Sequence, residues 1–288
     1  MTTRPARPAH GADSYVLGTH AEELERLRFQ NDLWRPSAEA AWHRAGLSRG
    51  ERVLDLGAGP GFAALDLARR VGPQGRVLAL ERSPVYVAAG RELAHQAGLR
   101  QLELRQHDLL HDPLPQGPAD QAAAGFDLVW MRWVAMFLAD PEPLLAGLPA
   151  VLRTGGRLVL HEYVHWDTFG LHPHGAAIHR FGQAVQQSFV AAGGDPDVNR
   201  RLPSQLAACG WRIDSLTPLP VLGGPGSMTA RWMERFVSVY SAQLIAQGLW
   251  STAQHAEAAA EISAAASDPG SFWVGPTVLE LRASRQPT

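Results

Sequence analysis

No lysine occurs among the 288 residues, and cysteine occurs once, at Cys209. All 26 basic residues are therefore arginines, so no lysine can act as a base or form a Schiff base. A single cysteine excludes a disulfide within the chain and a cysteine-cluster metal site. His172 and His174 are separated by Pro173, and no carboxylate-rich pattern lies near them. We therefore expect no metal site.

The chain also lacks a strong net charge and a long apolar run. Its net charge is −2 and 45% of its residues are hydrophobic, values that fit neither a disordered chain nor a nucleic-acid-binding protein. No stretch of about 18 apolar residues is present, so no membrane span is predicted. Residues 1–13 contain arginine and proline but no apolar signal-peptide core, and are predicted to form a loose tail. These features predict a cytoplasmic protein.

Strand-like and helix-like segments alternate from residue 51 to residue 162. Such alternation predicts an α/β fold with a doubly wound, mostly parallel sheet and helices on both faces. The later residues are mainly helical in pattern, with strands expected at 211–216 and 272–281. Four segments follow: the tail 1–13, a helical cap 14–47, an α/β core 48–165, and helical inserts with the last two strands at 166–288.

Residues 53–62 (VLDLGAGPGF) carry the most informative pattern. A short apolar run ends in glycines at every second position, which predicts a buried strand, a tight turn and the start of a helix. Glycine lets a ligand approach the main chain, and the helix start offers unpaired N–H groups. A second predicted strand, 76–81, ends in Glu81, whose carboxylate is placed to accept ribose hydroxyls. Together these features predict a site for an adenosine-containing ligand.

The pattern is G-x-G-x-G, with Phe62 where dinucleotide-binding proteins have a third glycine and with Asp55 before the turn. It resembles motif I of the class I S-adenosylmethionine (SAM)-dependent methyltransferases, in the bacterial small-molecule subgroup. Further resemblances are the acid Asp108, the strand-like residues 126–130, and residues 151–158 (VLRTGGRL), which are similar to the family's VLRPGGRL turn. The resemblance covers roughly residues 15–165. It implies a seven-stranded sheet with an antiparallel last strand, SAM as cofactor and S-adenosylhomocysteine (SAH) as product.

The resemblance also implies which residues hold SAM. A cap over its methionine end would include Tyr15, Arg26 and Gln30, although an amphipathic helix that merely covers the sheet explains the leucines of this segment equally well. The remaining implied cofactor residues are Asp55, Gly57, Ala58, Gly59, Gly61, Glu81, Arg82, Asp108, Leu109, Trp130 and Arg132.

The expected reaction is methyl transfer to a small molecule, with oxygen favoured over nitrogen or carbon as acceptor and a role in natural-product biosynthesis. Histidine titrates near neutral pH and suits a general base for a hydroxyl acceptor. His161, Glu162 and His165 follow the fifth predicted strand at the ligand edge of the sheet, so we expect the base among them. Aromatic residues in the inserts favour an apolar or aromatic acceptor, and the inserts are also a candidate homodimer contact.

Two alternatives stay open. A SAM-binding enzyme that transfers no methyl group, such as a cyclase or pericyclase, would share the same cofactor motif. A nicotinamide-dependent oxidoreductase shares the opening strand–turn–helix unit, but this chain lacks the third spaced glycine and the lysine of a Tyr-x-x-x-Lys pair.

Overall fold

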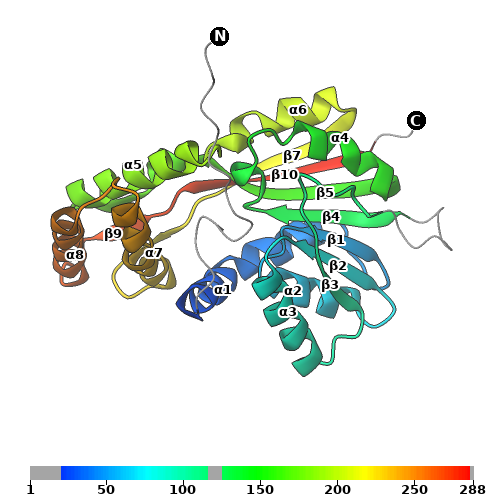
Figure 1. The fold of residues 1–288 in the computed structure, drawn as a ribbon, viewed down its shortest axis with the longest axis horizontal. Coiled ribbons are helices and arrows are strands. Elements are labelled where there is room, and N and C mark those ends of the chain that lie inside the picture. Colours follow the sequence, from blue (N-terminus) through cyan, green and yellow to red (C-terminus); the bar gives the residue numbers. More distant parts are fainter. Residues whose placement is uncertain (1–20, 116–124, 286–288) are drawn as a thin grey trace, which may run out of the picture.

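A computed structural model describes residues 21–115 and 125–285. Its main sheet has seven strands in the order β3-β2-β1-β4-β5-β10-β7 (Figure 1). β10 runs antiparallel to both β5 and β7, and the other paired neighbours are parallel. The predicted α/β fold with an antiparallel last strand is confirmed. The strands are β1 Arg52–Leu56, β2 Arg76–Glu81, β3 Leu102–Gln106, β4 Phe126–Arg132, β5 Leu152–His165, β7 Trp211–Leu219 and β10 Thr277–Arg285.

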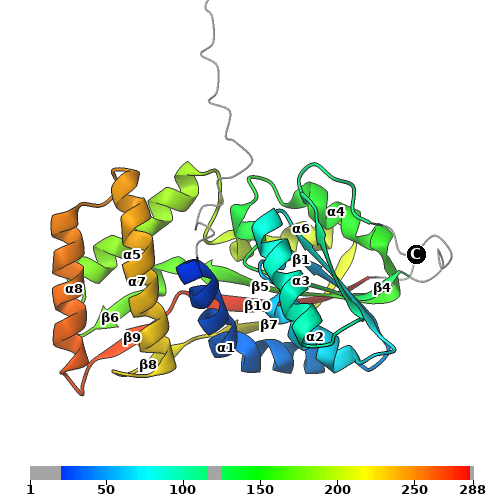
Figure 2. The same ribbon diagram turned by 60° about the horizontal axis from the view of Figure 1, so that its bottom comes forward.

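Helices cover both faces of this sheet, as the alternation of strands and helices predicts (Figures 1 and 2). α1 (Ala21–Arg44), α2 (Phe62–Val71) and α3 (Pro84–Gln96) lie on one face, and α4 (Glu142–Val151) and α6 (Leu202–Ala208) lie on the other. Within the described ranges, no helix combines the length and the apolar character that a membrane crossing needs.

The helical inserts form a lobe beyond one end of the sheet (Figure 2). Its helices are α5 Ala176–Ala191, α7 Met228–Ala246 and α8 Thr252–Ala266. A small antiparallel sheet lies beside them, with the order β6-β9-β8, formed by β6 Gly170–His172, β9 Phe272–Val274 and β8 Leu222–Gly223. The prediction of a single strand at 272–281 is therefore wrong. Gly275 and Pro276 interrupt it, so that β9 joins the small sheet and β10 joins the large one.

The N-terminal helix α1 connects the lobe to the core. It runs as one helix of 24 residues through Pro36, within the predicted helical cap 14–47. Its last residue, Arg44, pairs with the fully buried Glu280 of β10. The predicted cap residue Tyr15 lies outside the described residues.

Candidate active site

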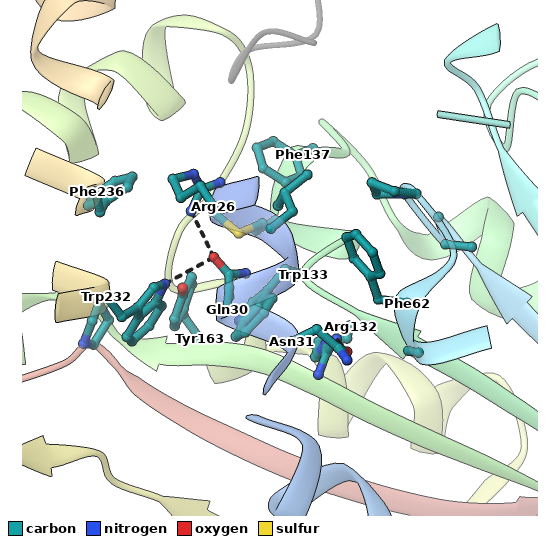
Figure 3. Close-up of a pocket in the computed structure, with 18 of the residues that line it drawn as sticks. Arg26, Gln30, Asn31, Phe62, Arg132, Trp133, Phe137, Tyr163, Trp232 and Phe236 are labelled. Carbon is teal, nitrogen blue, oxygen red and sulfur yellow. Dashed lines mark hydrogen bonds between the residues drawn. The ribbon is translucent and has the colours of Figure 1, made fainter. Parts of the chain in front are cut away.

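A cavity opens at the carboxyl ends of β1, β4 and β5 (Figure 3). It lies between α1, α7 and the turn at residues 57–61, here called the glycine turn. This edge is where open α/β sheets bind their ligands. One part of its wall is polar and main-chain-rich, and the other is aromatic. The lining residues are Arg26, Leu27, Gln30, Asn31, Asp55, Gly57, Ala58, Gly59, Pro60, Phe62, Ala63, Trp130, Arg132, Trp133, Met136, Phe137, Tyr163, Trp166, Phe169, Phe189, Trp232, Met233, Phe236 and Pro276.

The glycine turn is closed on its inner side and open toward the cavity. Gly57, Gly59 and Gly61 have φ values of +64°, +56° and +81°, which disfavour side chains. A Cβ on Gly57 would lie 2.4 Å from Val134 Cγ2, and a Cβ on Gly61 would lie 2.9 Å from Leu104 Cδ2. A Cβ on Gly59 would meet no atom within 4 Å. Gly59 is therefore the position at which a ligand can approach the main chain.

Glu81 holds this turn from the neighbouring strand. Its Oε2 accepts a hydrogen bond of 2.9 Å from the Gly59 N–H, and its Oε1 accepts one of 2.8 Å from the Ser83 N–H. Burial raises the pKa of Glu81, and the two N–H donors partly offset that rise. A carboxylate has about four lone-pair sites, so Glu81 keeps capacity for ligand hydroxyls.

Arg82, Asp108 and Leu109 lie beside Glu81 at the same sheet edge, because the His107 N–H donates to the Glu81 carbonyl at 2.9 Å. Asp108 Oδ1 accepts from the Leu110 N–H at 2.9 Å and its Oδ2 lies 3.0 Å from His111 Nδ1. Partial burial alone would raise the pKa of Asp108, but these contacts lower it. The carboxylate thus shapes its own loop and is not among the cavity-lining groups.

Asp55 and Arg132 lie buried below the turn. Burial raises the pKa of Asp55 to about 8; Arg132 opposes the rise and Glu81 adds to it. Burial lowers the pKa of Arg132 to about 10. Arg132 Nη2 donates to Asn31 Oδ1 at 2.7 Å. Asp55 Oδ2 and Arg132 Nη1 are buried without a hydrogen-bond partner among the described residues. Buried unpaired polar atoms are costly, so they indicate a polar ligand group here.

Arg26, Gln30 and Trp232 meet where α1 faces α7 (Figure 3). Arg26 is buried and donates to both oxygens of Glu23, at 2.7 and 2.6 Å. Its Nη1 donates to Gln30 Oε1 at 2.8 Å, and Trp232 Nε1 donates to the same oxygen at 3.1 Å. The predicted cap residues Arg26 and Gln30 are therefore brought to the cavity and connect the cap to the insert.

Aromatic rings form the other part of the cavity wall. Trp133 and Tyr163 stack at 5.6 Å between ring centroids, and Trp166 meets Tyr163 edge to face at 5.1 Å. Burial raises the pKa of Tyr163 well above its usual value, so its hydroxyl keeps its proton. Trp166 of η3 (Trp166–Thr168) contacts the rings of Phe169, Phe189 and Phe236, which continue the wall. Trp232 of α7 also lines it.

Glu162 is fully buried, is not among the cavity-lining residues, and supports the segment that forms one wall of the cavity. Its Oε1 accepts from the N–H groups of Val134 and Ala135 at 2.7 and 2.8 Å, at the start of the 3₁₀ turn Ala135–Phe137. Trp133, just before this turn, has φ +53°, a conformation that is rare for a bulky residue. Burial raises the pKa of Glu162 to about 7, against the effect of these N–H donors.

The two candidate histidines do not line the cavity. His161 is fully buried, packs against Trp130 with ring centroids 4.8 Å apart, and has its Nε2 3.5 Å from Glu280 Oε2. Burial lowers the pKa of His161. His165 is exposed at the end of β5. A catalytic base among His161, Glu162 and His165 therefore stays a prediction without support from their positions.

Eight of the predicted cofactor residues line the cavity: Arg26, Gln30, Asp55, Gly57, Ala58, Gly59, Trp130 and Arg132. Asn31, Trp133 and Tyr163 also line the cavity and are not among the predicted cofactor or base residues. Neighbouring side chains of a strand point to opposite faces of the sheet. This alternation could have predicted that Tyr163 and Glu162 of β5 do not both line the cavity. In the described part of the chain, no three His, Cys, Asp or Glu residues are grouped as metal ligands.

The residues fit the parts of SAM. An open glycine backbone, a buried carboxylate beside it, and unpaired Asp55 and Arg132 atoms suit a ligand with ribose hydroxyls, an amino group and a carboxylate. The same edge carries no third glycine of the dinucleotide pattern. The geometry thus favours SAM over a nicotinamide dinucleotide.

A family model described as "Methyltransferase domain" matches residues 47–195, slightly more than half of the chain. Aklanonic acid methyltransferase DauC of Streptomyces sp. (strain C5) is 35% identical over 109 residues, which cover 38% of this chain and 46% of that protein. The chain spans about half the length of the first curated relatives it matches.

Solved structures share the fold. The [4+2]-cyclase SpnF is similar with a TM-score of 0.54 and 20% identity, over 88% of this chain and 81% of SpnF. Geranyl diphosphate C-methyltransferase from Streptomyces coelicolor A3(2), crystallised with SAH, is similar with a TM-score of 0.54 and 17% identity, over 96% and 89% of the two chains. With the family match, the sheet order and the open glycine turn in agreement, the chain belongs to the class I SAM-dependent methyltransferases.

Proposed function

We propose that this protein transfers a methyl group from SAM to a small, apolar or aromatic acceptor. The observation that carries the proposal is that one cavity contains both the open glycine turn and the aromatic wall. A methyl donor seated at Gly59 would then meet an acceptor that lies against Trp133 and Tyr163. Proteins commonly bind small apolar molecules in such pockets with a few polar groups that set orientation.

The cofactor half would be held by groups that are already in position. Gly59 offers its backbone, Glu81 offers free lone pairs for the ribose, and the unpaired Asp55 and Arg132 atoms face polar groups of the methionine moiety. Arg82, Asp108 and Leu109 would border the adenine at the same edge. Because Glu81 is fixed by two backbone donors, little ordering is needed when a ligand binds.

SAM, when bound, supplies a methyl group that is already activated by its sulfonium. The work left to the protein is alignment of the acceptor and exclusion of water, and such positioning can lower a barrier by about 7–11 kcal/mol. The buried aromatic wall shields the acceptor, and the protonated Tyr163 hydroxyl can donate a hydrogen bond to an acceptor oxygen other than the one that is methylated. Oxygen as the methylated atom and a role in natural-product biosynthesis are part of this proposal, and a hydroxyl acceptor would lose its proton to solvent as the methyl group is transferred.

The test is a titration followed by an acceptor screen. Calorimetry should give micromolar binding of SAM and SAH and no binding of NAD. Incubation with SAM and a panel of hydroxylated aromatic compounds should then yield products heavier by one methyl group. Binding of NAD alone would contradict the proposal, whereas SAM-dependent conversion without any gain in mass would indicate the cyclase-like alternative.

A further inference from the structure

We propose that Gln30 selects the acceptor, and that this acceptor is an uncharged, flat, unsaturated molecule with a carbonyl oxygen that accepts a hydrogen bond from Gln30 Nε2. The inference rests on the proposed function, because it assigns the acceptor half of the same cavity. It begins with the direction in which the Gln30 amide is held.

The orientation of this amide is fixed by chemistry. Arg26 Nη1 lies 2.8 Å and Trp232 Nε1 lies 3.1 Å from the same atom of Gln30 (Figure 3). A guanidinium and an indole N–H can only donate, so the atom facing them must be the amide oxygen. Rotation of the amide by 180° would place its NH₂ group against two donors. The two bonds therefore exclude the flipped orientation and direct Nε2 away from Arg26 and Trp232.

Gln30 Nε2 is thus a pair of donors held at the cavity wall. Gln30 lines the cavity, and no group among the described residues accepts a hydrogen bond from its Nε2. A donor that a bound molecule would cover needs an acceptor on that molecule, because an unpaired buried amide is costly. The matching group is an oxygen with free lone pairs.

The side chains around Gln30 indicate the charge and shape of the rest of the acceptor. Arg26 is the charged residue at this end of the wall, and Glu23 offsets it through two short hydrogen bonds. A carboxylate or phosphate on the acceptor would have to be buried without an opposite charge of its own, which is unfavourable. The neighbouring Trp232, Phe236 and Tyr163 present ring surfaces, which suit a flat unsaturated body. An uncharged carbonyl compound satisfies both requirements.

The experiment compares 9-fluorenone with fluorene, two planar tricyclic molecules in which a carbonyl of the first replaces a methylene group of the second. Their dissociation constants are measured by quenching of tryptophan fluorescence, with and without saturating SAH. We expect the wild-type protein to bind fluorenone about tenfold more tightly, as one net hydrogen bond allows. Equal binding of the two probes, or binding of neither, would overturn the proposal.

Gln30→Glu is the informative variant. A carboxylate can still accept from Arg26 and Trp232, so the contact between α1 and α7 is kept, but the donor toward the cavity is lost. This variant should bind fluorenone and fluorene with about equal affinity, and its affinity for fluorene should equal that of the wild type. Gln30→Leu, which also removes the contact with Trp232, should lose the same preference and weaken both probes.

SAH affinity separates this proposal from the proposed function. If Gln30→Glu weakens SAH and leaves the fluorenone preference intact, Gln30 belongs to the cofactor site and the acceptor assignment is wrong. If the wild type binds no SAH at all but distinguishes the two probes, the methyl-transfer proposal fails while the carbonyl site stands.

Discussion

The Glu81 carboxylate accepts a hydrogen bond of 2.9 Å from the Gly59 N–H, and thereby ties the end of β2 to the one open position of the glycine turn. Loss of this carboxylate removes both a support for the turn and the proposed ribose acceptor. We expect Glu81→Gln to weaken SAM binding about ten- to a hundredfold, the range for a hydrogen bond to a charged group. Calorimetric titration measures the change.

Glu103→Gln on neighbouring β3 is the control for that experiment. Glu103 pairs with Arg76 and Arg105 at the surface, whereas Glu81 accepts from the Gly59 N–H of the glycine turn. It should leave SAM affinity unchanged. An unaltered SAM affinity in folded Glu81→Gln would remove Glu81 from the proposed site.

The open side of the turn gives a second prediction. Gly59→Ala adds a methyl group where we expect ligand to approach, so SAM affinity should fall at least about tenfold. Gly98→Ala is a matched control, because Gly98 has φ +65° and open space for a Cβ, as Gly59 does, but lies outside the cavity. Both variants should lose about 1 kcal/mol of unfolding free energy from left-handed strain. Equal SAM affinity in the two variants would show that Gly59 contacts no ligand.

Glu162 gives a prediction on pH. Burial raises its pKa to about 7 in the folded protein, above the ordinary glutamate value, so the folded state holds this proton more tightly than the unfolded state. The stability this proton confers is present below about pH 4.5 and is lost as the pH rises through 7, by about 3 kcal/mol at most. Glu162→Gln cannot ionise, so its free energy of unfolding relative to wild type should increase from pH 5 to pH 8. Urea unfolding across this range measures it, and a difference that does not change with pH would contradict the assignment.

The positions of His165 and Tyr163 predict opposite effects on catalysis. His165 is exposed at the end of β5, whereas Tyr163 is buried and lines the cavity. We expect His165→Ala to retain full turnover and Tyr163→Phe to raise the KM for the acceptor or lower kcat about tenfold, the effect of one hydrogen bond. Steady-state kinetics with the acceptor found in the screen decides this. A large loss of kcat in His165→Ala would restore it as a base.

Features that depend on neighbouring residues could be predicted from the sequence. The glycine turn at 57–61 and the acid that ends β2 are local patterns, and the order of strands and helices follows from alternation. The small sheet could not be predicted in this way, because Leu171, Leu222 and Trp273 come together from distant parts of the chain. Only the Gly275–Pro276 pair gave a local sign that residues 272–281 form two strands.

The candidate site shows the same limit. Only the resemblance places Arg26 and Gln30 at the cofactor, because the bond between Trp232 and Gln30 joins residues about 200 positions apart. The histidines are predicted at the ligand edge because they come at the end of the fifth predicted strand, but β5 extends to His165 and includes His161. Packing sets the position of His161, which lies against Trp130 and beside Glu280 in the core. Such packing depends on β10, whose place in the sheet the local sequence around His161 does not specify.

Pro36 lies inside α1, which continues as one helix on both sides of it. Proline has no N–H to donate within the helix, so the hydrogen-bond ladder is broken at this turn. Beyond it, Arg44 is anchored to Glu280; before it, Gln30 is joined to α7 through Trp232. The same side of Pro36 is also held to the core, because Asn31 accepts from Arg132 of β4 and Arg35 donates to Asp66 of α2. α1 therefore ties α7, the helix that follows the glycine turn and β10 to one another, so the cofactor part and the acceptor part of the cavity share one continuous support.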